Sequence, residues 1–186
     1  MMIGEGPPFP AAYVARELDE FPSGAVVIEL RPSGQSDPGG LIFEVDPHVT
    51  DSWVGFARPG PARVVHAASG LVPTPNPTQL CAIARGTAYL VDVRDHKYCL
   101  ASDPVVAVAA LRAARLLLLA TPWLVVAIGR EGVAWRTGRL AIDGLRLDET
   151  DRSRVIGVAD PDSAEPREFA IDLETGEHEG GAVVAP

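Results

Sequence analysis

The sequence predicts a mainly β fold, an antiparallel meander or propeller-like array of hairpins in an open sheet or sandwich, with little helix. A strand–turn–strand pattern occupies Leu80–Val93 and recurs at Leu116–Gly129, and a looser copy spans Val155–Leu173. The first two copies start 36 positions apart (116 − 80 = 36), and a period of about 35–40 residues is typical of β-arrays such as propeller blades. The 18 glycines and 17 prolines suit a fold with many turns.

We expect the 186 residues to form one domain with four unequal parts. Residues 1–12 are rich in glycine and proline and carry no pattern, which predicts a mobile arm. Residues 13–70 predict an irregular β part, and residues 71–178 contain the repeated hairpin array. Residues 179–186 are mostly small and predict a flexible tail.

Short apolar runs predict the elements of the N-terminal part. Ala25–Leu30 and Leu41–Val45 flank a stretch of turn residues and predict a hairpin with a long loop. Asp51–Ala57 and Ala62–Ala67 predict two further short strands. Tyr13–Phe21 predicts a short helical turn.

Residues 103–120 fit either a helix or two strands. The Asp-Pro pair at 103–104 resembles a helix start, whereas valines at 105, 106 and 108 favour a strand. Because the repeat places a strand at Leu116–Ala120, we expect two strands joined near Ala113–Ala114. Further along, Val133–Arg136 and Leu140–Ile142 predict strands, the second followed by a hairpin-type Asp-Gly turn at 143–144.

Charge and composition exclude several kinds of partner. The formal net charge of −9 makes nucleic acid and anionic membranes poor partners, because both favour clustered Lys and Arg. The most apolar segment, Leu116–Ile128, contains a proline and is shorter than the roughly 20 residues of a membrane span. With no secretory signal in view, we expect a cytoplasmic protein, and the Ala-, Arg- and Val-rich composition indicates a bacterial one. Cys81 and Cys99 are expected as buried free thiols, although neighbouring strands would permit a disulfide.

Two strings carry a resemblance to known proteins. Residues 135–145 follow the pattern WRT-x-RL-x-x-DGL, and residues 172–176 read DLETG, a DLxTG pattern. With Asn76-Pro77, these strings resemble a set of uncharacterised bacterial proteins of similar size and mostly β structure, over roughly residues 71–182. The DLETG string is also similar to strand ends in β-propeller repeats. Because only about three units are detectable, the resemblance implies an open array, or two copies that close one assembly, and it implies no particular activity.

Trp123, Trp135 and Arg136 are the candidate binding residues, since Trp and Arg are enriched at interface hot spots. Trp123 follows Pro122 at a predicted hairpin tip, where an exposed indole would suit an interface. Trp135 fits the role of a buried core anchor as well as that of a binding residue.

Asp46, His48 and Asp51 form an alternative site. Two carboxylates and an imidazole within residues 46–51 would suit a partial metal site, or a general base with its orienting partner, although an exposed loop fits the same residues. The sequence contains no Gly-x-Ser-x-Gly elbow, no glycine-rich phosphate loop and no histidine pair at metal-ligand spacing. We therefore expect no cofactor.

These observations favour a non-enzymatic protein-interaction module, immunity-like or regulatory, that binds a protein partner or a second copy of itself. The alternative is a small-ligand-binding protein or hydrolase with its site near Asp46, His48 and Asp51. A pocket that gathers those three residues would favour the alternative. A tryptophan-bearing face or a paired sheet edge would favour the interaction module.

Overall fold

The computed structural model describes residues 2–3, 9–32, 34, 39–151 and 153–182. In this part of the chain every regular element is a β-strand, and no helix is long and apolar enough to cross a membrane. The strands pair mostly antiparallel in open sheets of four or five members. The predicted mainly β fold, an array of hairpins, is therefore confirmed.

The sheets follow one another along the chain, and we number them 1 to 4. In sheet 1 the strand order is β2 (Tyr13–Leu18), β4 (Leu41–Pro47), β5 (Trp53–Ala57), β3 (Val27–Leu30). Sheet 2 has the order β6 (Gly70–Pro73), β7 (Gln79–Ala84), β8 (Thr87–Asp92), β9 (Tyr98–Ser102). Sheet 3 has the order β1 (Met2–Ile3), β10 (Ala107–Leu111), β11 (Leu116–Ala120), β12 (Val125–Gly129), β13 (Gly132–Arg136). Sheet 4 has the order β14 (Leu145–Thr150), β15 (Arg154–Ala159), β16 (Arg167–Asp172), β17 (His178–Gly180).

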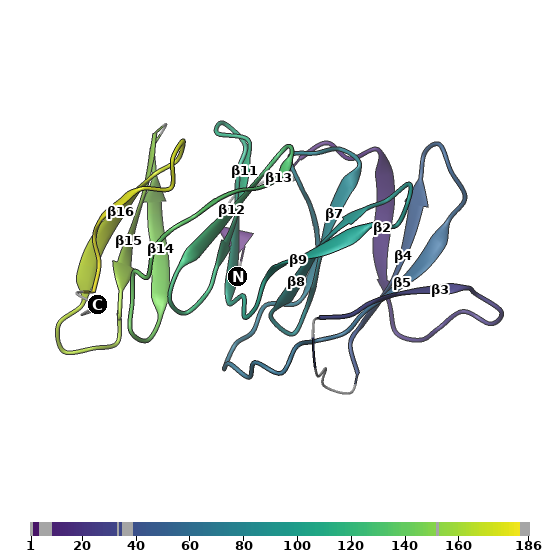
Figure 1. Ribbon diagram of the computed structural model, residues 1–186, viewed down its shortest axis with the longest axis horizontal. Helices are drawn as coiled ribbons and strands as arrows, with labels where there is room; N and C mark the ends of the chain where they lie inside the picture. Colours follow the sequence, from purple (N-terminus) through teal and green to yellow (C-terminus); the bar gives the residue numbers. More distant parts are fainter. Residues whose placement is uncertain (1, 4–8, 33, 35–38, 152, 183–186) are drawn as a thin grey trace.

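The sheets stack side by side along the long axis of the molecule (Figure 1). A hydrophobic cluster fills the space between sheets 1 and 2, another fills that between sheets 2 and 3, and a further one that between sheets 3 and 4. Side chains alternate between the faces of a strand, so Leu117 and Leu119 pack toward sheet 2 while Leu116 and Leu118 pack toward sheet 4. A strand buried on both faces has no polar positions, which explains the wholly apolar sequence of β11.

The repeated pattern in the sequence corresponds to the two central strands of a sheet. Its copies form the antiparallel pairs β7–β8, β11–β12 and β15–β16. At residues 103–120 the expected pair of strands is also confirmed. Strands β10 and β11 pair antiparallel and are joined by a turn in which Arg115 has a φ of 54°.

Each of the two end sheets carries an ion pair on its outer face. Arg16 of β2 forms an ion pair with Glu44 of β4 on sheet 1, and Arg146 pairs with Asp148 within β14 on sheet 4. Stacked-repeat proteins need such polar outer faces on their terminal units to stay soluble. Sheets 1 and 4 are therefore the end sheets of the stack formed by the described residues.

Several sequence expectations are corrected by the structure. The helical turn expected at Tyr13–Phe21 is instead β2, because Tyr13 and Ala15 alternate into the core between sheets 1 and 2. Ala62–Ala67 and Leu140–Ile142 form no strand. Leu140 is buried in an irregular segment that precedes β14.

The part expected to be irregular, residues 13–70, contains the complete sheet 1, in which β3 lies parallel to β5. Within the expected mobile arm, Met2–Ile3 form β1 and pair in parallel with β10, near the middle of the stack (Figure 1). Residues 1 and 4–8 of that arm lie outside the described residues, as do residues 183–186 of the expected tail.

Two tryptophans fasten neighbouring sheets in the same way. Trp53 of β5 donates its indole N–H to the carbonyl oxygen of Val93 at 3.0 Å, and Trp135 of β13 donates to that of Leu173 at 2.9 Å. Each acceptor lies in the turn that joins the last two strands of the following sheet. The two tryptophans thus make the same kind of hydrogen bond 82 positions apart (135 − 53 = 82), Trp53 from an inner strand of sheet 1 and Trp135 from the edge strand of sheet 3.

The turns that receive these tryptophans share a left-handed residue. His96 has a φ of 62° and Gly176 a φ of 75°, and each donates its amide to the carbonyl four residues earlier, at 3.0 and 2.9 Å. The ring of His96 lies against Trp53 with 4.8 Å between centroids. A β-carbon at Gly176 would instead lie 2.7 Å from ring carbons of Trp135, so glycine is required there.

Candidate functional site

The structure brings two of the three candidate binding residues, Trp123 and Arg136, to one pocket. This pocket has a volume of about 300 Å³ and lies where the β11–β12 turn and the end of β13 approach β9. Trp123 is 38% exposed, and Leu100 of β9, which also lines the pocket, is 40% exposed. The Trp123 indole and the Arg136 guanidinium therefore line one pocket.

Hydrogen bonds fix the turn that carries Trp123. The hydroxyl of Thr121 accepts the backbone N–H of Trp123 at 3.1 Å and that of Leu124 at 2.9 Å. The carbonyl oxygen of Trp123 accepts N–H groups from Leu140 at 2.7 Å and Ala141 at 3.3 Å. The backbone of Trp123 is thus held in place by the fold itself.

Arg136 spans the gap between sheets 3 and 2. Its Nη2 donates to the carbonyl oxygen of Ala101 at 2.7 Å. This bond uses one of the five N–H donors of the guanidinium, whose planar fork suits carbonyl and carboxylate acceptors. Arg136 can therefore brace the pocket and keep N–H donors for a further acceptor.

Trp135 takes the role of core anchor. It is buried in the cluster between sheets 3 and 4, and its indole N–H donates to the carbonyl oxygen of Leu173. Successive residues of a strand point to opposite faces. Burial of Trp135 toward sheet 4 therefore places Arg136 on the side of sheet 2.

No family model matches this chain, and no curated protein matches it. The strings that carried the resemblance have structural roles in the fold. Trp135 fastens sheet 3 to sheet 4, and the Thr137 hydroxyl accepts the N–H of Val125 at 3.0 Å. The backbone N–H of Gly144 donates to the carbonyl of Pro122 at 3.0 Å. These contacts tie the segment after β13 to the turn of Trp123.

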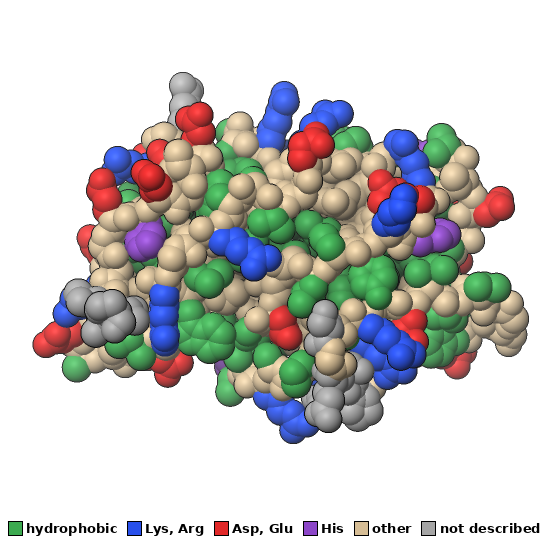
Figure 2. Space-filling view, viewed as in Figure 1, with side chains coloured by type: hydrophobic (Ala, Val, Ile, Leu, Met, Phe, Trp, Pro, Cys, Tyr) green, Lys and Arg blue, Asp and Glu red, His purple; other side chains and the backbone are tan. Residues whose placement is uncertain are grey.

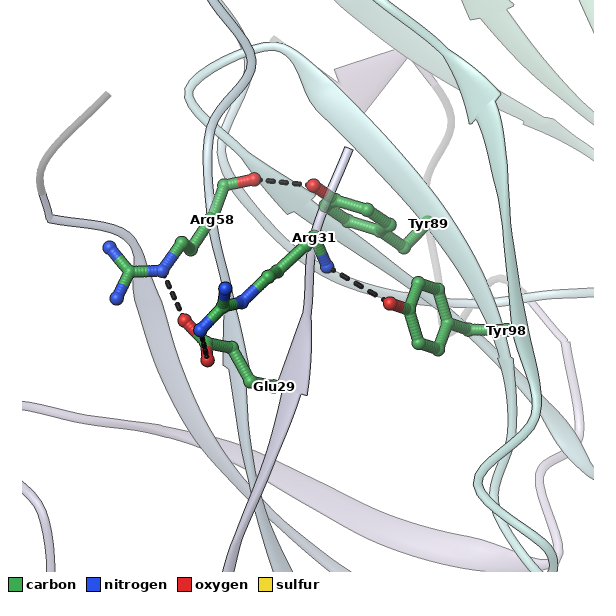
Figure 3. Close-up of polar contacts among 5 residues, drawn as sticks. All are labelled: Glu29, Arg31, Arg58, Tyr89 and Tyr98. Carbon is green, nitrogen blue, oxygen red and sulfur yellow. Dashed lines mark hydrogen bonds and ion pairs between the residues drawn. The ribbon is translucent and has the colours of Figure 1, made fainter. Parts of the chain in front are cut away.

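A polar cluster joins the outer edges of sheets 1 and 2 (Figure 3). Arg31 and Arg58 each bind one carboxylate oxygen of Glu29, and the hydrogen bonds from these two guanidinium groups hold the pKa of Glu29 below its usual value. The Arg31 backbone N–H donates to the Tyr98 hydroxyl at 3.2 Å, and the Tyr89 hydroxyl donates to the Arg58 carbonyl. The cluster thereby holds β3 against sheet 2.

Asp46, His48 and Asp51 are not gathered into a pocket. The hydroxyl of Ser52 donates to Asp46 at 2.9 Å, and His48 and Asp51 lie exposed in the loop between β4 and β5. The neighbouring cavity of about 430 Å³ is lined by Ser52 and other residues, but by none of the three. Within the described ranges, no group of three His, Cys, Asp or Glu side chains is placed to hold a metal ion.

Asp103 lines the same pocket as Trp123, and the sequence suggested only a helix start there. The Thr87 hydroxyl donates to its carboxylate at 3.3 Å and accepts the N–H of Gly60 at 2.6 Å. Burial raises the pKa of the Asp103 carboxyl above its usual value. An Asp-Pro pair carries no local signal for this environment, because Thr87 and Gly60 are distant in sequence.

A wider cleft, of about 1110 Å³, opens between the loop of His66 and the loops of Asp143 and Asp160. The carboxylate of Asp160 accepts the N–H groups of Ile142 at 2.9 Å and Asp143 at 2.5 Å. These two hydrogen bonds hold the loop of Asp143 against the loop of Asp160. We assign no chemistry to this cleft.

The two cysteines should react very differently with a thiol reagent. Cys81 is buried and Cys99 is exposed, and both lie opposite Leu90 on flanking strands, which places them about 10 Å apart, too far for a disulfide. Burial also raises the pKa of the Cys81 thiol to about 12. In an Ellman titration at pH 8 we expect one fast thiol in the native protein and a second only after unfolding. Rapid reaction of the Cys99→Ser variant would contradict this assignment.

Proposed function

We propose that this chain is a non-enzymatic protein-interaction module whose binding surface is centred on Trp123 and Arg136. The observation that carries the proposal is the exposed indole of Trp123 on a turn fixed by hydrogen bonds, beside an arginine and a small pocket. Trp and Arg are enriched at interface hot spots, and a backbone already held in place loses little entropy on binding. Figure 2 shows hydrophobic side chains exposed over the middle of the stack, with Lys or Arg side chains nearby.

The charge of the chain supports a partner with a cationic surface. A net charge of −9 steers such a partner toward the molecule and disfavours acidic proteins. An immunity-like or regulatory protein that covers a basic surface of its partner in the cytoplasm fits this charge. Trp123 would then supply the apolar centre of the contact.

Site-specific photo-crosslinking in the native host tests this function. A benzophenone side chain at position 123 should yield a discrete covalent adduct with one protein, whereas the same group at Val26 should not. Val26 is 81% exposed and lies just before β3 in sheet 1, so it controls for collisional labelling.

Titration of the adduct partner with purified protein completes the test. Trp123→Ala should weaken binding at least tenfold, which corresponds to about 1.4 kcal/mol, and hot-spot truncations typically exceed this. Val133→Ala, which truncates a side chain of similar exposure on β13, should leave the affinity unchanged. Equal labelling at positions 123 and 26, or unchanged binding by the Trp123→Ala variant, would refute the proposal.

A further inference from the structure

Two polar side chains in the pocket beside Trp123 have hydrogen-bonding capacity to spare. Arg136 forms no ion pair with any carboxylate of the described residues, and its guanidinium bonds to the carbonyl oxygen of Ala101. Ser102 is 8% exposed, and within the same part of the chain its hydroxyl has no hydrogen-bond partner. Buried polar groups are nearly always hydrogen-bonded, so a nearly buried hydroxyl at a pocket without a partner points to a bound group.

The register of sheet 2 turns the Ser102 side chain toward sheet 3. Ser102 lies opposite Ala88, and Ala88 packs in the cluster between sheets 2 and 3. Residues that are paired across an antiparallel ladder point to the same face of the sheet. Arg136 reaches the same region from the other side, because it donates across the gap to Ala101. The two side chains therefore come to one pocket from two sheets.

The other polar side chains of this pocket are already engaged. The Thr121 hydroxyl donates to one backbone carbonyl and accepts two N–H groups of its own turn. The Asp103 carboxylate accepts from Thr87, and Thr87 lies opposite Ala84, which packs in the cluster between sheets 1 and 2. That carboxylate is therefore directed to the side of sheet 1. The unpaired side chains of the pocket are both groups that can donate.

We infer that this pocket receives an acidic side chain of the partner protein. Its carboxylate accepts from the planar fork of Arg136 and from the hydroxyl of Ser102, and its aliphatic stem lies against the exposed indole of Trp123. An ionised carboxylate only accepts hydrogen bonds, so it matches a pair of donors. A Lys or Arg side chain in the same place would be repelled by the guanidinium. The occupant belongs to the partner proposed above, and the inference rests on that proposal.

A single acidic side chain is compatible with a partner whose surface is basic. The net charge of −9 steers the basic surface toward the molecule. The Arg136 guanidinium acts only at short range, since exposed charges are screened beyond about 8 Å at physiological salt. Arg136 therefore fixes the register of the contact and rejects basic side chains at one position.

An NMR titration of the full isotope-labelled chain tests the pocket without knowledge of the partner. The probe is N-acetylglutamate α-methylamide, whose only charge is the side-chain carboxylate, and the control compound is the glutamine analogue of the same shape. The probe should shift the Trp123 indole N–H and Arg136 Nε–H signals saturably, with a millimolar Kd, and the glutamine analogue should shift neither. The indole signals of the two buried tryptophans serve as internal references.

Substitutions separate the roles of the two donors. Arg136→Gln should abolish the shift of the Trp123 signal, and Ser102→Ala should weaken probe binding about threefold to tenfold, the effect of one hydrogen bond. Arg130→Gln is the matched control, because Arg130 is an exposed arginine in the turn at the opposite end of the β12–β13 hairpin. This variant should bind the probe as the wild type does.

A charge swap with the cross-linked partner completes the test. Arg136→Glu should abolish partner binding, and replacing the contacting acidic residue of the partner by arginine should restore it. Absence of a saturable shift with the glutamate probe, equal shifts with the glutamine analogue, or unchanged probe binding by the Arg136→Gln variant would each overturn the inference. If Trp123→Ala still weakens partner binding in that case, the interaction function stands. Probe binding without any partner adduct would instead refute the proposed function alone, since the pocket would still take a carboxylate.

Discussion

Replacing Gly176 by alanine should lower the free energy of unfolding by about 2–4 kcal/mol. The φ of 75° at this position costs a residue with a β-carbon about 1 kcal/mol. The new methyl group would also lie 2.7 Å from ring carbons of Trp135, and overpacking of this kind costs about 1–3 kcal/mol. Urea unfolding monitored by tryptophan fluorescence measures the change.

The equivalent position in sheet 2 provides the matched control. His96→Gly should change the free energy of unfolding by less than about 1 kcal/mol, because relief of the left-handed backbone offsets the lost ring contact with Trp53. A Gly176→Ala variant as stable as the wild type would contradict the role given to Trp135. Equal losses at both positions would show that the two turns are not distinguished by their tryptophan contacts.

The packing of Trp135 against sheet 4 links the stability of the fold to the proposed binding surface. Trp135 and Arg136 are consecutive residues on opposite faces of β13, one held by Leu173 of sheet 4 and the other aimed at sheet 2. Anchoring the indole therefore fixes the backbone that presents the guanidinium to the pocket. A variant that loosens the Trp135 contact should also weaken partner binding, without any change at the surface.

The central hairpins could be predicted from the sequence because each of their strands is buried on two faces. Strand β11 contains four consecutive leucines for this reason, and Leu80–Ala84 in β7 is an unbroken apolar run for the same reason. Sheet 1 is less visible in the sequence because it ends the stack and buries one face. Its strand β2 exposes Val14 and Arg16, so its apolar and polar residues alternate only weakly. The helix-forming residues of this segment therefore led to the prediction of a helical turn. The parallel pairing of β3 with β5 depends on contacts distant in sequence.

The candidate site was partly predictable for the same physical reasons. The exposure of Trp123 follows from its place at a hairpin tip after Pro122. The burial of Trp135 could not be deduced locally, because the face of β13 that is covered depends on sheet 4 and on Leu173. Asp103 was missed since its partner, Thr87, lies in another strand.

Truncating either of two adjacent leucines, Leu117 or Leu118, to alanine should cost about 2–5 kcal/mol of unfolding free energy. The two side chains point to opposite faces of β11, one into the cluster with sheet 2 and one into the cluster with sheet 4, and both are fully buried. If one face of sheet 3 were exposed to solvent, as in a two-sheet sandwich, the substitution on that face would be nearly neutral. Chemical denaturation of both variants therefore tests the stacking of the sheets directly.

An end sheet should show the opposite behaviour. On β15, Val155 is 1% exposed and faces sheet 3, whereas Ile156 is 40% exposed on the outer face. Val155→Ala should cost about 2 kcal/mol and Ile156→Ala less than about 1 kcal/mol. Because neighbouring residues share the same strand, propensity and backbone effects largely cancel within each pair. Similar losses of unfolding free energy for the two β11 variants would show that sheet 3 lies inside the stack. Unequal losses for the two β15 variants would show that sheet 4 lies at its end.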